Sequence, residues 1–138
     1  MKARVQWLDG RAFVGESGSG HAVVMDGAAD GGGRNLAPRP MEMVLLGTGG
    51  CTAYDVVVIL TRSGQDVRGC EVKLEADRAE TDPKVFTRIH FQFTVRGRGL
   101  KRNIVERAVQ LSHDKYCSAS AMLAHTATIT TGIDIIED

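Results

Sequence analysis

Apolar and polar residues alternate along two separate parts of the chain. Residues 2–26 contain three short alternating segments, separated by an Asp-Gly turn and a Gly-Ser-Gly turn. Turns of this kind between period-two segments predict a three-stranded antiparallel meander. Residues 67–80 and 85–96 alternate in the same way around a short polar turn, which predicts a hairpin with one solvent-exposed face.

Two other stretches have helical periodicity. Pro40 suits the first turn of a helix and Gly64 suits its end, so we expect a helix from about residue 40 to residue 63. This helix is apolar around much of its circumference, which predicts burial on several sides. Residues 100–111 place apolar side chains three and four positions apart, which predicts an amphipathic helix ending near Tyr116.

The last part of the chain completes the predicted fold. Residues 127–136 read as a closing strand, and the preceding SASAMLAHT predicts one further helical turn. The predicted order is therefore βββ-α-ββ-α-β, with a glycine-rich loop at residues 27–40 before the first helix. Strands and helices segregated in this way are typical of the α+β class. A length of 138 residues predicts a single domain over residues 1–138.

Composition and charge exclude several classes of partner. The 17 basic and 17 acidic residues cancel, so no charge excess indicates binding to nucleic acid or to an anionic membrane surface. The first residues lack the apolar core of a signal peptide, so we expect a cytoplasmic protein. The apolar run Met43–Leu60 is nearly long enough to span a bilayer, but Asp55 would be costly in lipid, which favours a buried segment.

The chain contains three cysteines, Cys51, Cys70 and Cys117, and none belongs to a C-x-x-C pair. Structural disulfides are rare in a reducing compartment, which leaves core packing, redox chemistry or metal binding as their roles. Cys70 shares a strand face with apolar residues and is interpreted as a packing residue. Zinc sites usually include a local ligand pair, and the scattered cysteines and histidines provide none, so we expect no metal and no other cofactor.

The stretch LLGTGGCTAYD, residues 45–55, places three glycines and Cys51 inside the predicted helix. A phosphate-binding loop would need these glycines between a strand and a helix, whereas here helical residues precede them. Glycine inside a helix costs about 1 kcal/mol relative to alanine, so close approach of a neighbouring element is the favoured explanation. Gly47, Gly50 and Cys51 would then border that contact.

A second copy of the same helix would satisfy this contact, and we expect a two-fold homodimer, the commonest assembly. The alternative is a monomer in which the sheet covers one side of the helix and the second helix covers the other.

The segment RPMEMVLLGTGGCTAYDVVVIL (Arg39–Leu60), followed by YCSAS (Tyr116–Ser120) with its cysteine 66 positions after Cys51, resembles the OsmC/Ohr family and its OsmC-like branch. The predicted order of elements agrees with that family along essentially the whole chain. The resemblance implies an OsmC-like fold with a long buried central helix, in an intertwined homodimer. It also implies a thiol peroxidase without a metal or prosthetic group.

In such a peroxidase, the resemblance implies that Cys51 attacks an organic hydroperoxide, becomes a sulfenic acid, and is resolved by Cys117 as a disulfide. A lipoyl group or other dithiol would then reduce the pair. The steps agree with the known reactivity of thiolates and sulfenic acids. We therefore expect a peroxidase of oxidative-stress defence. The alternative is a non-enzymatic dimer of the same fold that senses redox state or binds a small molecule.

Peroxidases of the family place an arginine and a glutamate near the first cysteine, with the glutamate directly after the proline. Met41 occupies that position here, and Glu42 follows it. Glu42 and Cys51 are nine residues apart, or about 13.5 Å, on opposite faces of a straight helix. Glu42 could therefore reach only the thiol of a partner.

Three arginines are alternatives for the helper residue, namely Arg11, Arg34 and Arg39, and Arg39 is preferred because it precedes the helix. An arginine beside Cys51 would favour the thiolate and orient the peroxide. Asp55, one helical turn beyond Cys51, would oppose the thiolate unless a cation pairs with it.

His113 precedes Cys117 by four residues. Its imidazole would neighbour that thiol if the helix continues, but a solvent-facing histidine at the end of a helix is the favoured interpretation. Tyr54 and Tyr116 would either line a pocket or belong to the core.

Overall fold

The computed structural model describes all 138 residues, and they form two compact units, Met1–Leu46 and Gly47–Asp138. The order of elements is βββ-α-ββ-α-β with a short additional helix before the last strand, so the predicted α+β order is confirmed. The prediction that the whole chain is one domain stays a prediction.

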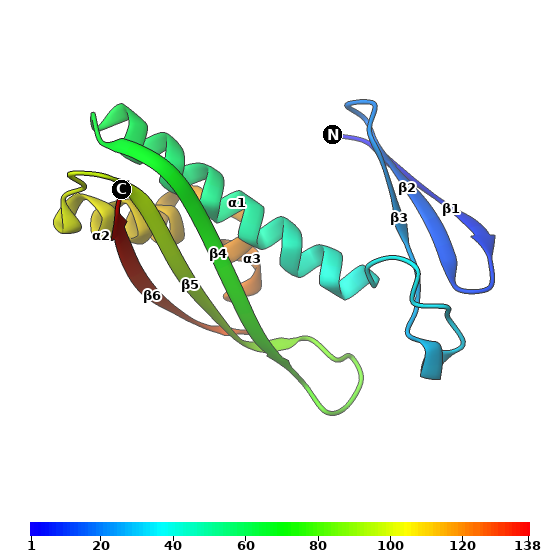
Figure 1. The fold of residues 1–138 in the computed structure, drawn as a ribbon. Helices are drawn as coiled ribbons and strands as arrows, with labels where there is room; N and C mark the ends of the chain where they lie inside the picture. The colour runs from blue at the N-terminus through cyan, green and yellow to red at the C-terminus, as the bar shows by residue number, and fades with distance from the viewer. The chain divides into compact units, whose positions relative to one another are not determined.

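The first unit contains an antiparallel sheet of three strands in the order β1-β2-β3 (Figure 1). Its strands are β1 (Ala3–Asp9), β2 (Ala12–Ser17) and β3 (Ala22–Met25). Val14 is paired with Gln6 of β1 and with Val24 of β3. The predicted meander is therefore confirmed.

The loop after β3 is organised by the buried carboxylate of Asp26. This carboxylate accepts hydrogen bonds from the backbone N–H groups of Gly27, Leu36 and Arg34, at 2.7, 3.2 and 3.3 Å. The bonds from Gly27 and Leu36 lower the pKa of Asp26 below its ordinary value. A single side chain thus orders a glycine-rich segment that the sequence indicated only as a long loop.

The long helix α1 (Pro40–Arg62) has the bounds that its proline and glycine signals predicted. Its buried stripe lies at positions three and four apart and consists of Thr48, Gly49, Thr52, Val56 and Leu60. A Cβ atom on Gly49 would lie 2.7 Å from Cδ1 of Leu74, so this glycine allows the sheet to approach closely. Gly47 and Gly50, by contrast, have no neighbour within 4 Å of the corresponding position.

α1 is also the one helix long and apolar enough to cross a membrane. The core helix of a soluble protein has the same length and composition, and this helix packs its small and apolar stripe against the second sheet. That packing accounts for the buried part of the helix, which is 28% of its most apolar window.

The second unit contains a mixed sheet in the order β4-β5-β6 (Figure 1). Its strands are β4 (Asp66–Arg78), β5 (Phe86–Arg98) and β6 (Thr128–Glu137). β4 and β5 form the predicted antiparallel hairpin, and β6 runs parallel to β5. Parallel neighbours need a long connection, and α2 (Arg102–Leu111) and α3 (Ser118–Leu123) lie within it.

The core of this unit lies on one face of the sheet. Ile89, Phe91, Phe93 and Val95 alternate along β5 and are fully buried, whereas the intervening side chains are partly exposed. Val105 of α2 is fully buried as well. The helices cover this face and leave a largely polar face outside, as a sheet with one wet side requires.

Candidate redox site

The end of α2 determines where Cys117 lies. After Leu111 the chain widens into one π-helical turn, Ser112–Tyr116, which the backbone N–H of Cys117 closes by donating to the Ser112 carbonyl at 2.7 Å. Such turns recur at functional sites. Cys117 is then the N-cap residue of α3 and is buried.

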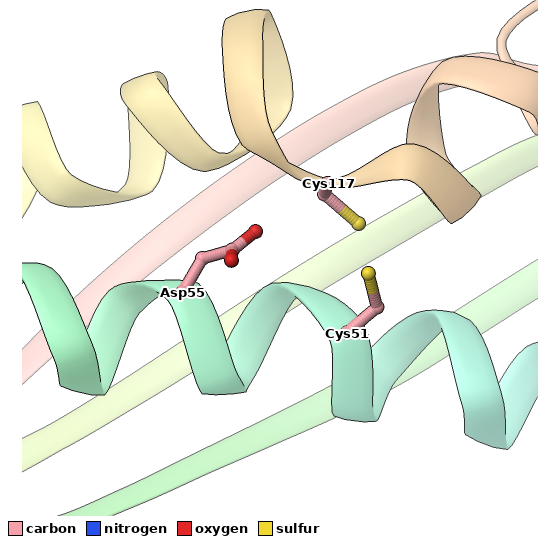
Figure 2. Close-up of side chains that lie close together, drawn as sticks. All are labelled: Cys51, Asp55 and Cys117. Carbon is pink, nitrogen blue, oxygen red and sulfur yellow. The ribbon is translucent and has the colours of Figure 1, made fainter.

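Cys51 and Asp55 lie one turn apart on α1, both half-buried. Figure 2 shows the Cys51 and Cys117 sulfur atoms pointing toward one another, with the Asp55 side chain beside them. The two sulfurs and a carboxylate oxygen of Asp55 all lie within 4.8 Å of one another. The fold thus brings together two free thiols that are 66 residues apart in sequence.

Two serines hold this cluster in place. The Ser120 hydroxyl donates to Cys117 Sγ at 3.1 Å and the Ser120 backbone N–H donates to the same atom at 3.4 Å. Ser112 Oγ donates to Asp55 Oδ2 at 3.1 Å and lies 2.8 Å from Thr52 Oγ1. Ser112 therefore links α1 to the π-helical turn, and Ser120 orients the Cys117 sulfur.

Burial raises the pKa of the Cys117 thiol above its ordinary value, and the hydrogen bonds from Ser120 lower it in part. The surroundings of Cys117 therefore favour its protonated thiol form. Cys51 is half-buried and therefore the more accessible of the two sulfurs. Cys70, the third cysteine, is half-buried in β4, and burial raises its pKa too, in agreement with a packing role.

A cavity of about 440 Å³ opens beside Asp55. It lies between α1 and the end of α2, and its walls combine apolar side chains with Arg62 and Ser63. The lining residues are Tyr54, Asp55, Val58, Ile59, Arg62, Ser63, Leu111 and Tyr116. Tyr54 and Tyr116 therefore border a pocket and are not core residues, since both are exposed.

The three arginines proposed from the sequence all belong to the first unit, and each has an identified neighbour there. Arg39 pairs with Glu42, which lies 3.8 Å from its Nε, at the start of α1. Arg34 pairs with Asp9. Arg11 packs its side chain beside Gly27. Within the second unit, Asp55 forms no ion pair and has Ser112 as its hydrogen-bond donor.

His113 differs from both interpretations that the sequence left open. Its ring lies edge-on against Phe91, with ring centroids 4.9 Å apart, and both ring nitrogens are buried without a hydrogen-bond partner in the chain. The favoured interpretation, a solvent-facing histidine, is wrong because the ring nitrogens are buried. The alternative, a neighbour of Cys117, required a continuing α-helix. The wider π-helical turn replaces that spacing, and the imidazole packs against the sheet.

The unpartnered imidazole makes stability depend on pH. Burial lowers the pKa of His113, against the opposing effect of the nearby carboxylates of Asp114 and Asp55. A histidine with a lowered pKa stabilises the fold above the unfolded-state value of about 6.5, and that stabilisation is lost as pH falls through the folded-state value.

We therefore expect the urea midpoint of unfolding to decrease between about pH 7.5 and about pH 5.5, above the range in which most carboxyl groups titrate. His113→Leu should reduce this decrease. His21→Leu, which changes an exposed histidine, is the matched control. An unchanged pH dependence in His113→Leu would contradict the assignment.

Sequence reasoning found both cysteines and missed the polar residues around them. Ser120 is the third residue after Cys117. At this spacing a backbone N–H in the first turn of a helix donates to the side chain of the N-cap residue, here Cys117. Ser112 and Thr52 gave no such signal because they are 60 residues apart. Only the packing of α1 against the end of α2 brings them together.

Comparison with known proteins shows the family to which this chain belongs. The family model described as OsmC-like protein matches residues 31–132, which include both cysteines of the cluster. The chain belongs to the OsmC family. The resemblance inferred from the two cysteine segments is therefore confirmed. Protein YhfA of Escherichia coli strain K12 is 50% identical over 136 residues, which cover 99% of this chain and 98% of YhfA.

Solved structures agree with this OsmC-like fold. One of them is 48% identical, with a TM-score of 0.91, and covers the full length of both chains. A Legionella pneumophila structure, described as an organic hydroperoxide resistance protein OsmC, has 17% identity and a TM-score of 0.71 over 96% of this chain and 95% of its own. At that identity the likeness concerns the fold alone.

Proposed function

We propose that this OsmC-family protein reduces organic hydroperoxides in the cytoplasm through Cys51 and Cys117. The observation that supports this most is the approach of the two free sulfurs to within 4.8 Å. A disulfide requires a sulfur–sulfur distance of about 2.05 Å, so the thiols need to close by less than about 3 Å. The hydroperoxide resistance named for the Legionella relative is compatible with this chemistry.

In the proposed reaction, the Cys51 thiolate attacks the distal oxygen of the hydroperoxide and the O–O bond breaks. The alkoxide takes up a proton and leaves as an alcohol, while Cys51 becomes a sulfenic acid. The Cys117 thiolate then attacks the Cys51 sulfur, and the departing hydroxide leaves as water after protonation. An external dithiol supplies two electrons and two protons, and both cysteines return to thiols.

The surroundings of the two sulfurs support these roles. Cys51 is half-buried, so a peroxide can reach it, whereas Cys117 is 2% exposed. Burial raises the pKa of Cys117, which disfavours it as the first nucleophile. The hydrogen bonds from Ser120 hold its sulfur toward Cys51, where a resolving thiol is needed.

The cavity beside Asp55 favours an organic peroxide over hydrogen peroxide. Its volume of about 440 Å³ lies in the range of small-molecule sites, and Val58, Ile59 and Leu111 supply apolar wall. An alkyl or aryl group would occupy this space beside Asp55, which lies one helical turn from Cys51. Hydrogen peroxide has no such group to bury.

We further propose that the protein is a homodimer. All residues of β1 are exposed, including the apolar side chains of Val5 and Trp7. A sheet of three short strands needs apolar contacts beyond those that its own strands provide. On α1, Gly50 has open space beside it and Val57 is exposed. In a dimer, Arg39 and Glu42 would be the helper residues for the thiol of the other copy.

The dimer is tested by sedimentation at micromolar concentration. We expect twice the chain mass of 14.9 kDa. A mass equal to one chain would contradict the proposed interface.

The peroxidase is tested by adding cumene hydroperoxide or hydrogen peroxide to the reduced protein and following free thiol by stopped flow, with peptide mass spectrometry to identify the disulfide. We expect a Cys51–Cys117 disulfide, formed faster with cumene hydroperoxide. Thiol loss no faster than that of free cysteine would reject the peroxidase. It would favour a slow redox sensor or small-molecule binding protein, with which the unpaired carboxylate of Asp55 beside Cys51 also agrees.

A further inference from the structure

We propose that the reduced protein binds Zn²⁺ through Cys51, Cys117 and Asp55, with water in the fourth position. Sequence spacing argued against zinc because no two ligands are close along the chain. The fold removes that objection, since two sulfurs and a carboxylate oxygen converge within 4.8 Å.

The donor set suits zinc. Two thiolates and one carboxylate give soft and hard ligands together, a combination that Zn²⁺ accepts and that Mg²⁺ and Ca²⁺ do not. Zinc bonds of about 2.3 Å to sulfur and about 2.0–2.2 Å to oxygen place tetrahedral ligands roughly 3.4–3.8 Å apart. The cluster therefore needs to contract by about 1 Å, which side-chain rotation can supply.

Outer hydrogen bonds of the kind that support metal ligands are already in place. Ser120 donates twice to the Cys117 sulfur, which stabilises negative charge there. Ser112 donates to Oδ2 of Asp55, which orients the carboxylate and leaves Oδ1 free to bind. These contacts serve a metal-bound thiolate and carboxylate as well as they serve the proposed redox pair.

One member of the cluster, Asp55, faces a cavity. Asp55 lines the cavity of about 440 Å³ between α1 and the end of α2, so the side of the cluster next to Asp55 is accessible. Three protein ligands with one open position form the arrangement that exchanges metal and water, in contrast to a closed structural site.

Binding has a chemical consequence for the two thiols. Zn²⁺ displaces two thiol protons, and both sulfurs become metal-bound thiolates. A Cys51–Cys117 disulfide would remove both sulfur ligands, so only the reduced protein can hold the ion. Metal binding itself does not depend on the proposed peroxidase, whereas competition between zinc and hydroperoxide rests on it.

The first experiment is an anaerobic titration of the reduced protein with Co²⁺ as a spectroscopic substitute for Zn²⁺. We expect thiolate-to-cobalt charge-transfer absorption and the visible bands of tetrahedral Co²⁺, both lost when Zn²⁺ is added. Cys51→Ser and Cys117→Ser should each remove most of the charge-transfer intensity. Cys70→Ser, which changes a half-buried cysteine outside the cluster, should leave it unchanged.

Asp55→Asn tests the third ligand, because the amide oxygen can still accept the Ser112 hydrogen bond. We expect Zn²⁺ affinity to fall at least roughly tenfold, since even outer partners of metal ligands affect affinity by that much. Protein oxidised with diamide, which takes two electrons and two protons from the thiols, should bind no Co²⁺. Absent charge transfer, or equal spectra in Cys51→Ser and the unaltered protein, would reject the zinc site.

Different results would reject the zinc site and the peroxidase. Cobalt binding without peroxide-dependent thiol loss would remove only the peroxidase. Rapid disulfide formation without cobalt binding would remove only the zinc site. If both are correct, stoichiometric Zn²⁺ should slow thiol oxidation by cumene hydroperoxide, and a chelator should restore it.

Discussion

Cys51→Ser is expected to lower the rate of cumene hydroperoxide reduction at least about 1000-fold, which corresponds to roughly 4 kcal/mol of activation free energy. A serine hydroxyl is a far weaker nucleophile than a thiolate at neutral pH. The buried Cys117 cannot substitute, because burial raises its pKa and only 2% of it is exposed.

This effect is measured by following hydroperoxide consumption in the presence of excess dithiol. Cys70→Ser is the matched control, since it also removes one half-buried cysteine but lies on β4 outside the cluster. The control should retain the rate of the unaltered protein. A Cys51→Ser protein with more than about a tenth of the normal rate would place the attacking sulfur elsewhere.

The fold was accessible from sequence because its elements are locally consistent. α1 begins at Pro40 and ends shortly before Gly64. The alternation of apolar and polar residues along β4 and β5 assigns each side chain to one face of the sheet. Patterns of this kind depend on neighbours within a few residues, so a single sequence contains them. The parallel pairing of β6 with β5 is a long-range contact and needed the structure.

The site was predictable only in part, for the same physical reason. The cysteines were identified by residue type and by the resemblance that their flanking segments carry. Cys117 directly follows the π-helical turn Ser112–Tyr116, and such a turn has no simple sequence signal. The favoured interpretation of His113, a solvent-facing histidine at a helix end, was wrong because its ring packs against Phe91 of the distant strand β5, a contact with no local sequence signal.

The position of Asp55 connects the proposed functions of the cluster. The Asp55 carboxylate lies within 4.8 Å of both sulfurs, and a carboxylate in that position is a ligand for a divalent cation. The hydrogen bond from Ser112 spreads its charge without neutralising it. Asp55 is therefore a ligand in the proposed metal site and only a neighbour of the sulfurs in the proposed redox reaction.

Cys117→Ser is expected to separate the two steps of the reaction. The first step should proceed at nearly the normal rate, because Cys51 is unchanged. The resulting sulfenic acid then has no thiol within reach, since Cys70 lies outside the cluster. Excess peroxide will drive it to sulfinic acid, which dithiols do not reduce.

The variant should keep its fold, because Cys117 is the N-cap of α3 and serine is a favoured N-cap residue. After treatment with excess cumene hydroperoxide and then dithiol, we expect nearly complete recovery of thiol in the unaltered protein. In Cys117→Ser, recovery at Cys51 should fall to on the order of a tenth, with a mass gain of about 32 Da in the Cys51 peptide. Full recovery in the variant would show that Cys117 does not protect Cys51, and the resolving role would have to be abandoned.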